Sequence, residues 1–126
     1  MGKKILIVDD DADFREVMGV LLESKGYIIL EASDGESGYK KAKAEKPDLI
    51  ILDVMMAHKS EGFDIARKIH SDKEISRIPV IISTGVTKEM NLPFTFSPDE
   101  TWLPVKVVLN KPIKPDVLLK EVAKYI

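Results

Sequence analysis

Five short runs of apolar residues, each of strand length, recur along the chain between more polar stretches. They occupy residues 4–8, 27–32, 48–53, 78–84 and 105–110, and the run at 27–32 is the weakest. The apolar residues in these runs are continuous rather than alternating with polar ones. Continuous runs rich in β-branched residues are typical of strands that are buried on both faces, as in a parallel sheet. We therefore expect five buried strands.

Segments with the period of an amphipathic helix lie between these runs. The expected helices extend from Asp13 to Gly26, from Ser33 to Pro47, from Phe63 to Ser71 and onward from Pro115. The first two start with capping-box spacing, Asp13 with Glu16 and Ser33 with Glu36. Strands that alternate with helices imply βαβ units with right-handed crossovers. The pattern predicts one α/β domain over residues 1–126, with an open, doubly wound, five-stranded parallel sheet in three α/β/α layers.

One connection breaks this alternation. Residues 85–104 read GVTKEMNLPFTFSPDETWLP and contain prolines at positions 93, 98 and 104. A proline inside a helix costs about 3 kcal/mol, so a long regular helix is not expected here. The fourth helix of the alternating pattern is therefore predicted to be stunted or replaced by a loop.

Composition narrows the class of protein. Of the 126 residues, 44% are hydrophobic and 32% are charged, which is typical of globular proteins, and the net charge is −2. The sequence contains no block rich in lysine or arginine, so contact with nucleic acid is not expected. The absence of cysteine excludes disulfides, thiolate catalysis and cysteine zinc sites. No apolar stretch is long enough for a signal or membrane segment, so we expect a cytoplasmic protein.

Polar residues whose side chains could bind a ligand or take part in catalysis follow several of the predicted strands. The first strand is followed by Asp9 and Asp10, the third ends in Asp53, the fourth ends in Ser83 and Thr84, and the fifth ends in Asn110 and Lys111. In open α/β sheets, ligands bind beyond the carboxyl ends of the strands, where the strand order reverses. In the flavodoxin-like order 2-1-3-4-5, the first and third strands are neighbours. The three aspartates would then meet in one shallow pocket, flanked by Thr84 and Lys111.

Three carboxylates in one pocket suit a hard divalent cation. Mg²⁺ is bound by oxygen ligands, through one or two carboxylates together with water and phosphate oxygens. A carboxylate can also act as a nucleophile and form an aspartyl phosphate. A lysine and a hydroxyl nearby would stabilise the charge on an incoming phosphoryl group.

The chain resembles the receiver domains of bacterial two-component response regulators. The stretches that carry the resemblance are ILIVDDDADFRE, KPDLIILDVMM, EGFDIARKI, IPVIIST and NKP, which together span the chain except for residues 85–104. The resemblance implies that Asp53 accepts a phosphoryl group from a sensor histidine kinase or a phosphotransfer protein. It further implies that Asp10, Asp53 and the backbone carbonyl of Met55 contact Mg²⁺, and that Asp9 assists through water. Thr84 and Lys111 would contact the phosphoryl group.

Three positions depart from the family's common pattern. The family often has proline four residues after the phosphoacceptor, where this chain has Ala57, and alanine after the threonine, where it has Gly85. Many receivers carry at position 108 an aromatic residue that moves inward with the threonine, and here it is Val108. We therefore expect a switch that changes partner binding without this aromatic residue.

Other interpretations of the same residues remain open. In a haloacid-dehalogenase-like phosphatase, Asp9 and Asp11 would form the catalytic pair and Asp53 would be idle. A receiver that only binds a partner is a further alternative. All five site positions, however, carry residues that can support phosphorylation: Asp9, Asp10, Asp53, Thr84 and Lys111. Asp11 and Asp13 are interpreted as turn and helix-cap residues. As a receiver, the domain would catalyse only its own phosphorylation and dephosphorylation, and its downstream partner is not indicated.

Overall fold

The computed structural model describes residues 2–53, 61–84, 107–110 and 113–126; within these ranges, the side chains of 61–64, 84, 107–108 and 110 are outside the description. The strands are β1 (Lys4–Val8), β2 (Ile28–Ala32), β3 (Leu49–Asp53), β4 (Val80–Thr84) and β5 (Val107–Asn110). The helices are α1 (Ala12–Glu23), α2 (Gly35–Glu45), α3 (Glu61–Ser71) and α5 (Pro115–Tyr125). Among these helices, none has the length and hydropathy needed to cross a bilayer.

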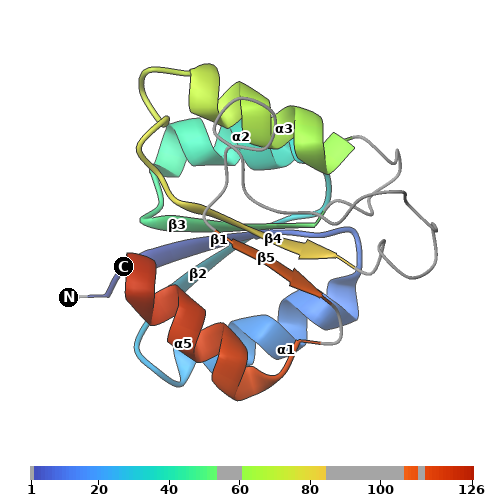
Figure 1. Ribbon diagram of the computed structural model, residues 1–126, viewed down its shortest axis with the longest axis vertical. Coiled ribbons are helices and arrows are strands. Elements are labelled where there is room, and N and C mark those ends of the chain that lie inside the picture. Colours follow the sequence, from blue (N-terminus) through green and yellow to red (C-terminus); the bar gives the residue numbers. More distant parts are fainter. Residues whose placement is uncertain (1, 54–60, 85–106, 111–112) are drawn as a thin grey trace.

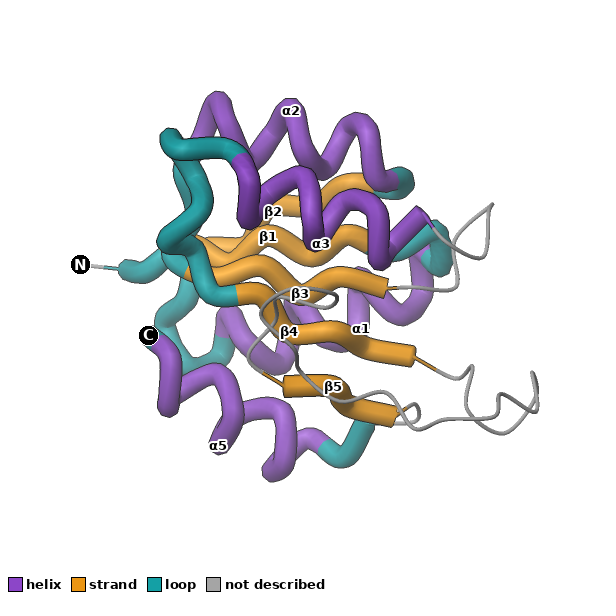
Figure 2. Tube along the Cα trace, turned by 45° about the horizontal axis from the view of Figure 1, so that its top comes forward, coloured by secondary structure: helices purple, strands orange, loops and turns teal. Residues whose placement is uncertain are grey.

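The five strands form one parallel sheet in the order β2-β1-β3-β4-β5, as predicted. Figure 1 shows α1 and α5 on one face of this sheet and α2 and α3 on the other, and Figure 2 shows the strands side by side. The three-layer α/β/α prediction is therefore confirmed. The prediction of a stunted fourth helix falls on residues 85–104, which lie outside the described residues.

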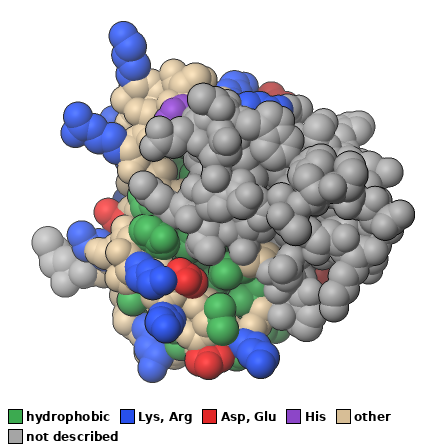
Figure 3. Space-filling model, in the orientation of Figure 1, with side chains coloured by type: hydrophobic (Ala, Val, Ile, Leu, Met, Phe, Trp, Pro, Cys, Tyr) green, Lys and Arg blue, Asp and Glu red, His purple; other side chains and the backbone are tan. Residues whose placement is uncertain are grey.

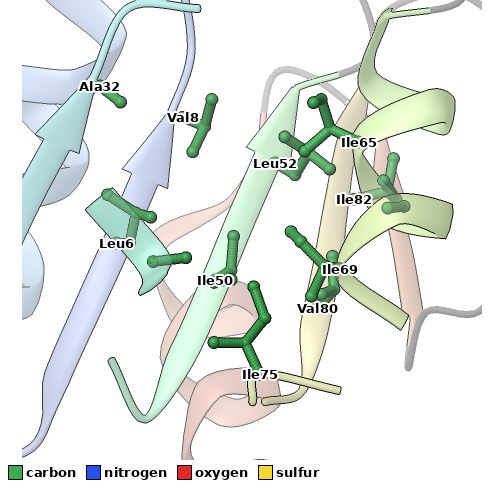
Figure 4. Close-up of a cluster of buried hydrophobic side chains, with 12 residues drawn as sticks. Leu6, Val8, Ala32, Ile50, Leu52, Ile65, Ile69, Ile75, Val80 and Ile82 are labelled. Atoms are coloured by element: carbon green, nitrogen blue, oxygen red, sulfur yellow. The ribbon is translucent and has the colours of Figure 1, made fainter. Parts of the chain in front are cut away.

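Two hydrophobic clusters fill the space between the layers. The cluster beneath α2 and α3 consists of Leu6, Val8, Ala32, Ala42, Ile50, Leu52, Ile65, Ala66, Ile69, Ile75, Val80 and Ile82. The cluster beneath α1 and α5 consists of Ile5, Ile7, Met18, Leu22, Leu49, Ile51, Ile81, Ile113, Leu118 and Val122. Figure 4 shows Ile65 and Ile69 of α3 over the strand residues of the first cluster. Residues along each strand alternate between the clusters because successive side chains point to opposite faces.

The caps of the first two helices differ from the prediction. Asp11, not Asp13, caps α1: its carboxylate accepts hydrogen bonds from the backbone N–H groups of Asp13 and Phe14, at 3.0 and 3.2 Å. Asp34, not Ser33, caps α2. In both cases the helix begins at a position where a neighbouring acceptor, not the predicted one, can reach the free N–H groups of the first turn.

The apolar stripe of α1 is narrower than predicted. The helical period of residues 13–26 predicts an apolar stripe made of Phe14, Val17, Met18, Leu21 and Leu22. Val17 is nevertheless 60% exposed, and Val20 is 62% exposed. Met18 and Leu22 on the same helix are buried, as expected. Exposed apolar side chains of this kind are ordinary on protein surfaces. Figure 3 shows hydrophobic side chains interspersed with basic and acidic ones in the lower half of the view, where α5 lies.

A polar cluster joins α2 to the turn after α3. The Tyr39 hydroxyl donates to the Asp72 carboxylate, and Lys43 lies 3.0 Å from the same carboxylate. These two contacts and the Glu74 N–H lower the pKa of Asp72 to about 2. Because this pKa is lower in the folded state than in the unfolded chain, the contacts stabilise the fold above the usual carboxyl pKa, and this stabilisation is lost as the pH falls toward 2.

Two helix glycines differ in the space around them. A Cβ on Gly38 of α2 would lie 2.7 Å from Cγ2 of Val8 in β1, whereas on Gly19 of α1 it would lie 3.5 Å from Cγ2 of Ile29. Alanine is favoured over glycine inside helices by about 1 kcal/mol. We expect Gly19→Ala to raise the free energy of unfolding by up to about 1 kcal/mol, and Gly38→Ala to lower it by about 1–3 kcal/mol through overpacking. Urea denaturation measures both, and a stabilising Gly38→Ala would contradict the close contact of α2 with β1.

Candidate functional site

Three aspartates meet at the carboxyl end of the sheet. Asp53 is the last residue of β3 and Asp9 directly follows β1. Since Val8 pairs with Leu52, the next residues along, Asp9 and Asp53, lie side by side on neighbouring strands. Carboxylate oxygens of Asp9, Asp10 and Asp53 lie within 4.8 Å of one another. The predicted meeting of these three side chains is confirmed.

The environment of these carboxylates fits a divalent cation. Asp9 and Asp53 are each only 1% exposed, whereas Asp10 is exposed to solvent. Buried carboxylates close to each other are unfavourable unless positive charge or hydrogen bonds compensate. Three oxygen donors, one of them open to solvent, match the preference of Mg²⁺ for a few carboxylates together with water and phosphate oxygens.

Backbone and side-chain contacts hold Asp9 in place. Its N–H donates to the carbonyl of Ala32 at 3.0 Å, which extends the contact of β1 with β2. Its Oδ1 accepts from the N–H of Asp11 at 2.9 Å. Arg15 donates through Nη1 to the Asp9 carbonyl at 2.6 Å and through Nε to Glu31 at 3.0 Å. The turn that carries two of the three carboxylates is thus tied to α1 and to β2.

Arg15 was not singled out from the sequence. It lies in the first turn of α1, where the helix dipole disfavours a cation. A basic residue at such a position needs a compensating acceptor, and this was the signal that could have drawn attention to it.

Asp11 lies outside the carboxylate cluster. Its Oδ1 is engaged as the α1 cap, which agrees with the interpretation of Asp11 as a helix-start residue. Asp13 is exposed in the first helical turn. The four acidic residues that follow β1 therefore divide into two that join Asp53 and two that belong to the start of the helix.

The remaining predicted site residues are only partly within the description. Thr84 ends β4 and pairs in register with Asn110 of β5, at the same edge of the sheet as Asp53, but its side chain is outside the described part. Met55 and Lys111 lie outside the described residues. Their predicted contacts with the metal and the phosphoryl group stay predictions.

Ser83 is a further polar residue at this edge; it stands beside Thr84 at the end of the fourth predicted strand, but no role was predicted for it. It pairs in register with Asp53, is 0% exposed, and its hydroxyl has no hydrogen-bond partner among the described residues. Within the run IPVIIST it reads as the polar end of a strand. Only the register shows that it is the neighbour of Asp53.

The fold and the carboxylate cluster agree with what sequence comparison finds. The sequence profile of the response regulator receiver domain matches residues 5–123. The chain belongs to this family. A receiver domain is a phosphorylatable signalling switch of two-component systems, which is the function predicted from the resemblance. The comparisons give no support to the haloacid-dehalogenase-like alternative.

Individual relatives agree with this assignment. The receiver domain is 35% identical over 123 residues to the alkaline phosphatase synthesis transcriptional regulatory protein PhoP of Bacillus subtilis, covering 88% of this chain but 50% of PhoP. It is 34% identical to the protein PilH of Pseudomonas aeruginosa, covering 94% of this chain and 93% of PilH. The chain thus spans half the length of PhoP and nearly all of PilH.

A solved structure shares the fold of this receiver domain. It is the receiver domain of a sensor histidine kinase from Pseudomonas aeruginosa, with a TM-score of 0.83 and 22% identity, covering 99% of this chain and 98% of that one. That domain has a magnesium ion coordinated in its active-site cleft.

Proposed function

We propose that Asp53 is the phosphoacceptor of this receiver domain and that Asp9, Asp10 and Asp53 hold Mg²⁺ together with the backbone carbonyl of Met55. The observation that carries the proposal is the cluster of three carboxylates within 4.8 Å, two of them buried. Asp53 is the member of this cluster that belongs to β3, the central strand of the sheet. The magnesium ion in the Pseudomonas aeruginosa receiver domain supports the same ligand here.

The reaction assigned to Asp53 is a single displacement. One oxygen of its carboxylate attacks phosphorus in a phosphohistidine or a small acyl phosphate, forming an O–P bond as the bond to the leaving group breaks. The leaving group keeps the electron pair of that bond. Burial limits the access of water, so the carboxylate is poorly solvated and held in one place on a rigid strand.

The other residues of the site would stabilise charge. Bound Mg²⁺ would offset negative charge on the phosphoryl oxygens as they approach the aspartates. Asp9, held by Asp11 and Arg15, would position the metal through water, and Asp10 would face it from the exposed side of the cluster. Thr84 would donate a hydrogen bond to the phosphoryl group, and Lys111 would pair with it.

The proposal also covers the phosphodonor, the downstream partner, the extent of the domain and its location in the cell. The phosphodonor is a sensor histidine kinase or a phosphotransfer protein, and phosphorylation changes the binding of a downstream protein. The chain is one receiver domain over residues 1–126, cytoplasmic, and it makes no contact with nucleic acid or membrane through this domain. It acts on no substrate besides its own Asp53. A binding-only receiver is disfavoured by the intact carboxylate cluster.

Stoichiometry tests whether the domain is a switch. In the presence of Mg²⁺ and excess acetyl phosphate, intact-protein mass spectrometry should detect at most one added phosphoryl group per chain. A phosphate ester such as p-nitrophenyl phosphate, in large excess, should not be turned over. Continued release of phosphate from the ester, in proportion to time and protein, would instead indicate a phosphatase.

A further inference from the structure

Ser83 carries a buried hydroxyl whose place in the sheet is next to Asp53. The two residues are paired in register on β4 and β3, and neighbouring strands lie about 4.8 Å apart. Ile51 and Ile81, two residues before each of them, belong to the cluster beneath α1 and α5. Because side chains alternate along a strand, Asp53 and Ser83 both point to that face of the sheet.

The Ser83 hydroxyl is unusual because it is buried and yet makes no hydrogen bond among the described residues. The residue is 0% exposed, and its Oγ has no hydrogen-bond partner among the described residues. Most buried polar side-chain atoms in proteins are hydrogen-bonded, and leaving one unpaired is unfavourable. The buried hydroxyl of Ser83 therefore calls for a role that an alanine side chain could not fill.

Among the described neighbours of Ser83 within the sheet, Asp53 is the one whose side chain can accept a hydrogen bond. Its partner in β5 is Leu109, and two residues before it on β4 is Ile81; both are apolar. On the β3 side it faces Asp53, whose side chain ends in carboxylate oxygens. A hydroxyl can rotate to donate in the direction where an acceptor becomes available.

We infer that the Ser83 hydroxyl is a hydrogen-bond donor to the phosphorylated form of Asp53. The inference rests on the proposed function of Asp53. Phosphorylation turns one carboxylate oxygen into the bridging oxygen of an acyl phosphate and leaves the other as a carbonyl oxygen. Neither carboxylate oxygen of unphosphorylated Asp53 bonds the Ser83 hydroxyl. A rotation of the side chain that places the phosphoryl group toward Asp9 and Asp10 brings the remaining carbonyl oxygen to Ser83, from which it accepts a hydrogen bond. The unpaired hydroxyl of the unphosphorylated state thereby gains its partner, which favours the phosphorylated state.

Three substitutions separate this role from a structural one. Ser83→Ala removes the hydroxyl, Ser83→Cys keeps nearly the same volume with only a weak donor, and Ser83→Thr keeps the hydroxyl. The probe is beryllium fluoride with Mg²⁺, which forms a phosphoryl-like adduct on a carboxylate, and binding is followed by backbone amide NMR of the full chain. The wild-type protein and Asp53→Asn establish first that the adduct forms at Asp53.

The expected result is a loss of adduct affinity of about fivefold to tenfold in Ser83→Ala and Ser83→Cys, the ratio given by one hydrogen bond of ordinary net strength. Ser83→Thr should stay within about twofold of wild type, because its donor is retained. Without the probe, the melting temperature of Ser83→Ala and Ser83→Cys should equal or exceed that of wild type. A merely structural serine would lower it.

Two outcomes would overturn the inference. Unchanged adduct affinity in both Ser83→Ala and Ser83→Cys would show that the hydroxyl does not contact the phosphorylated residue. A melting temperature lowered in both variants, with no selective loss of adduct affinity, would show a hydroxyl already paired in the unphosphorylated protein. If the wild-type protein forms no adduct that depends on Asp53, the proposed function itself fails, which is a different result from either.

Discussion

Replacement of Asp53 by asparagine is expected to reduce incorporation of a phosphoryl group from acetyl phosphate in Mg²⁺ to the background of the assay. The amide has nearly the shape of the carboxylate but lacks the anionic oxygen that attacks phosphorus. Asp53 is 1% exposed at the end of a central strand. Because asparagine has nearly the same shape as aspartate and fits the same buried space, the change should leave the fold intact. Incorporation is measured with radiolabelled acetyl phosphate, and the fold is checked by circular dichroism.

Asp11→Asn is the matched control for this experiment. It is the same chemical change a short distance away, at a residue that caps α1 and lies outside the carboxylate cluster. Asparagine is as good a helix N-cap as aspartate, so the variant should fold and be labelled like wild type. In a haloacid-dehalogenase-like site, Asp9 and Asp11 would be the reacting pair. Loss of labelling in Asp11→Asn, with full labelling of Asp53→Asn, would therefore reverse the assignment.

Magnesium should stabilise the fold, and removal of one carboxylate should have opposite effects with and without the metal. At a concentration about 100 times its dissociation constant, a ligand that binds only the folded state adds about 2.7 kcal/mol to the free energy of unfolding. In EDTA, Asp10→Asn removes one of three like charges within 4.8 Å and should raise that free energy by an amount on the order of 1 kcal/mol. In saturating Mg²⁺ the wild-type protein should be the more stable of the two.

Denaturant titrations of both proteins, in EDTA and over a series of Mg²⁺ concentrations, measure this reversal. Asp13→Asn is the control, because Asp13 is an exposed acid of the first turn of α1 that does not belong to the cluster. Its response to Mg²⁺ should match that of wild type. An equal gain from Mg²⁺ in Asp10→Asn and in wild type would contradict metal binding by the three carboxylates.

The sheet and its acidic edge could be predicted from the sequence because both depend on strong local signals. Continuous apolar runs separated by helical periods leave few topologies, and the observed order β2-β1-β3-β4-β5 is the one expected. Once β1 and β3 are neighbours, Asp9 and Asp53 must share an edge, since parallel strands place their carboxyl ends together. That geometry and the chemistry of carboxylates favour a metal site at the three aspartates. The separate roles of Asp9, Asp10 and Asp53 are what the resemblance to receiver domains implies.

Finer features could not be predicted because they depend on the exact position of the backbone. Asp11 and Asp13 are both competent caps, and only the point where α1 begins selects Asp11. The helical period of α1 includes Val17, but the width of the buried stripe depends on how the helix is rotated against the sheet. Residues 85–104, where the sequence departs most from the family's pattern, lie outside the described residues.

Arg15 and Ser83 illustrate a second limit. Each matters through a residue distant from it along the chain or on another strand: Arg15 through Glu31 and the carbonyl of Asp9, Ser83 through its register with Asp53. Neither the hydrogen bonds of Arg15 nor the register of Ser83 with Asp53 has a signature in local composition or periodicity. The first depends on how α1 lies against β2, and the second on the residue-by-residue pairing of β3 with β4.

The position of the phosphoryl group on the wild-type protein tests the central claim most directly. After reaction with acetyl phosphate in Mg²⁺, reduction with borohydride converts an aspartyl phosphate to homoserine, which tandem mass spectrometry locates in a peptide. The account predicts homoserine at position 53 and aspartate retained at positions 9, 10 and 11. Homoserine at position 9, with position 53 unmodified, would contradict it.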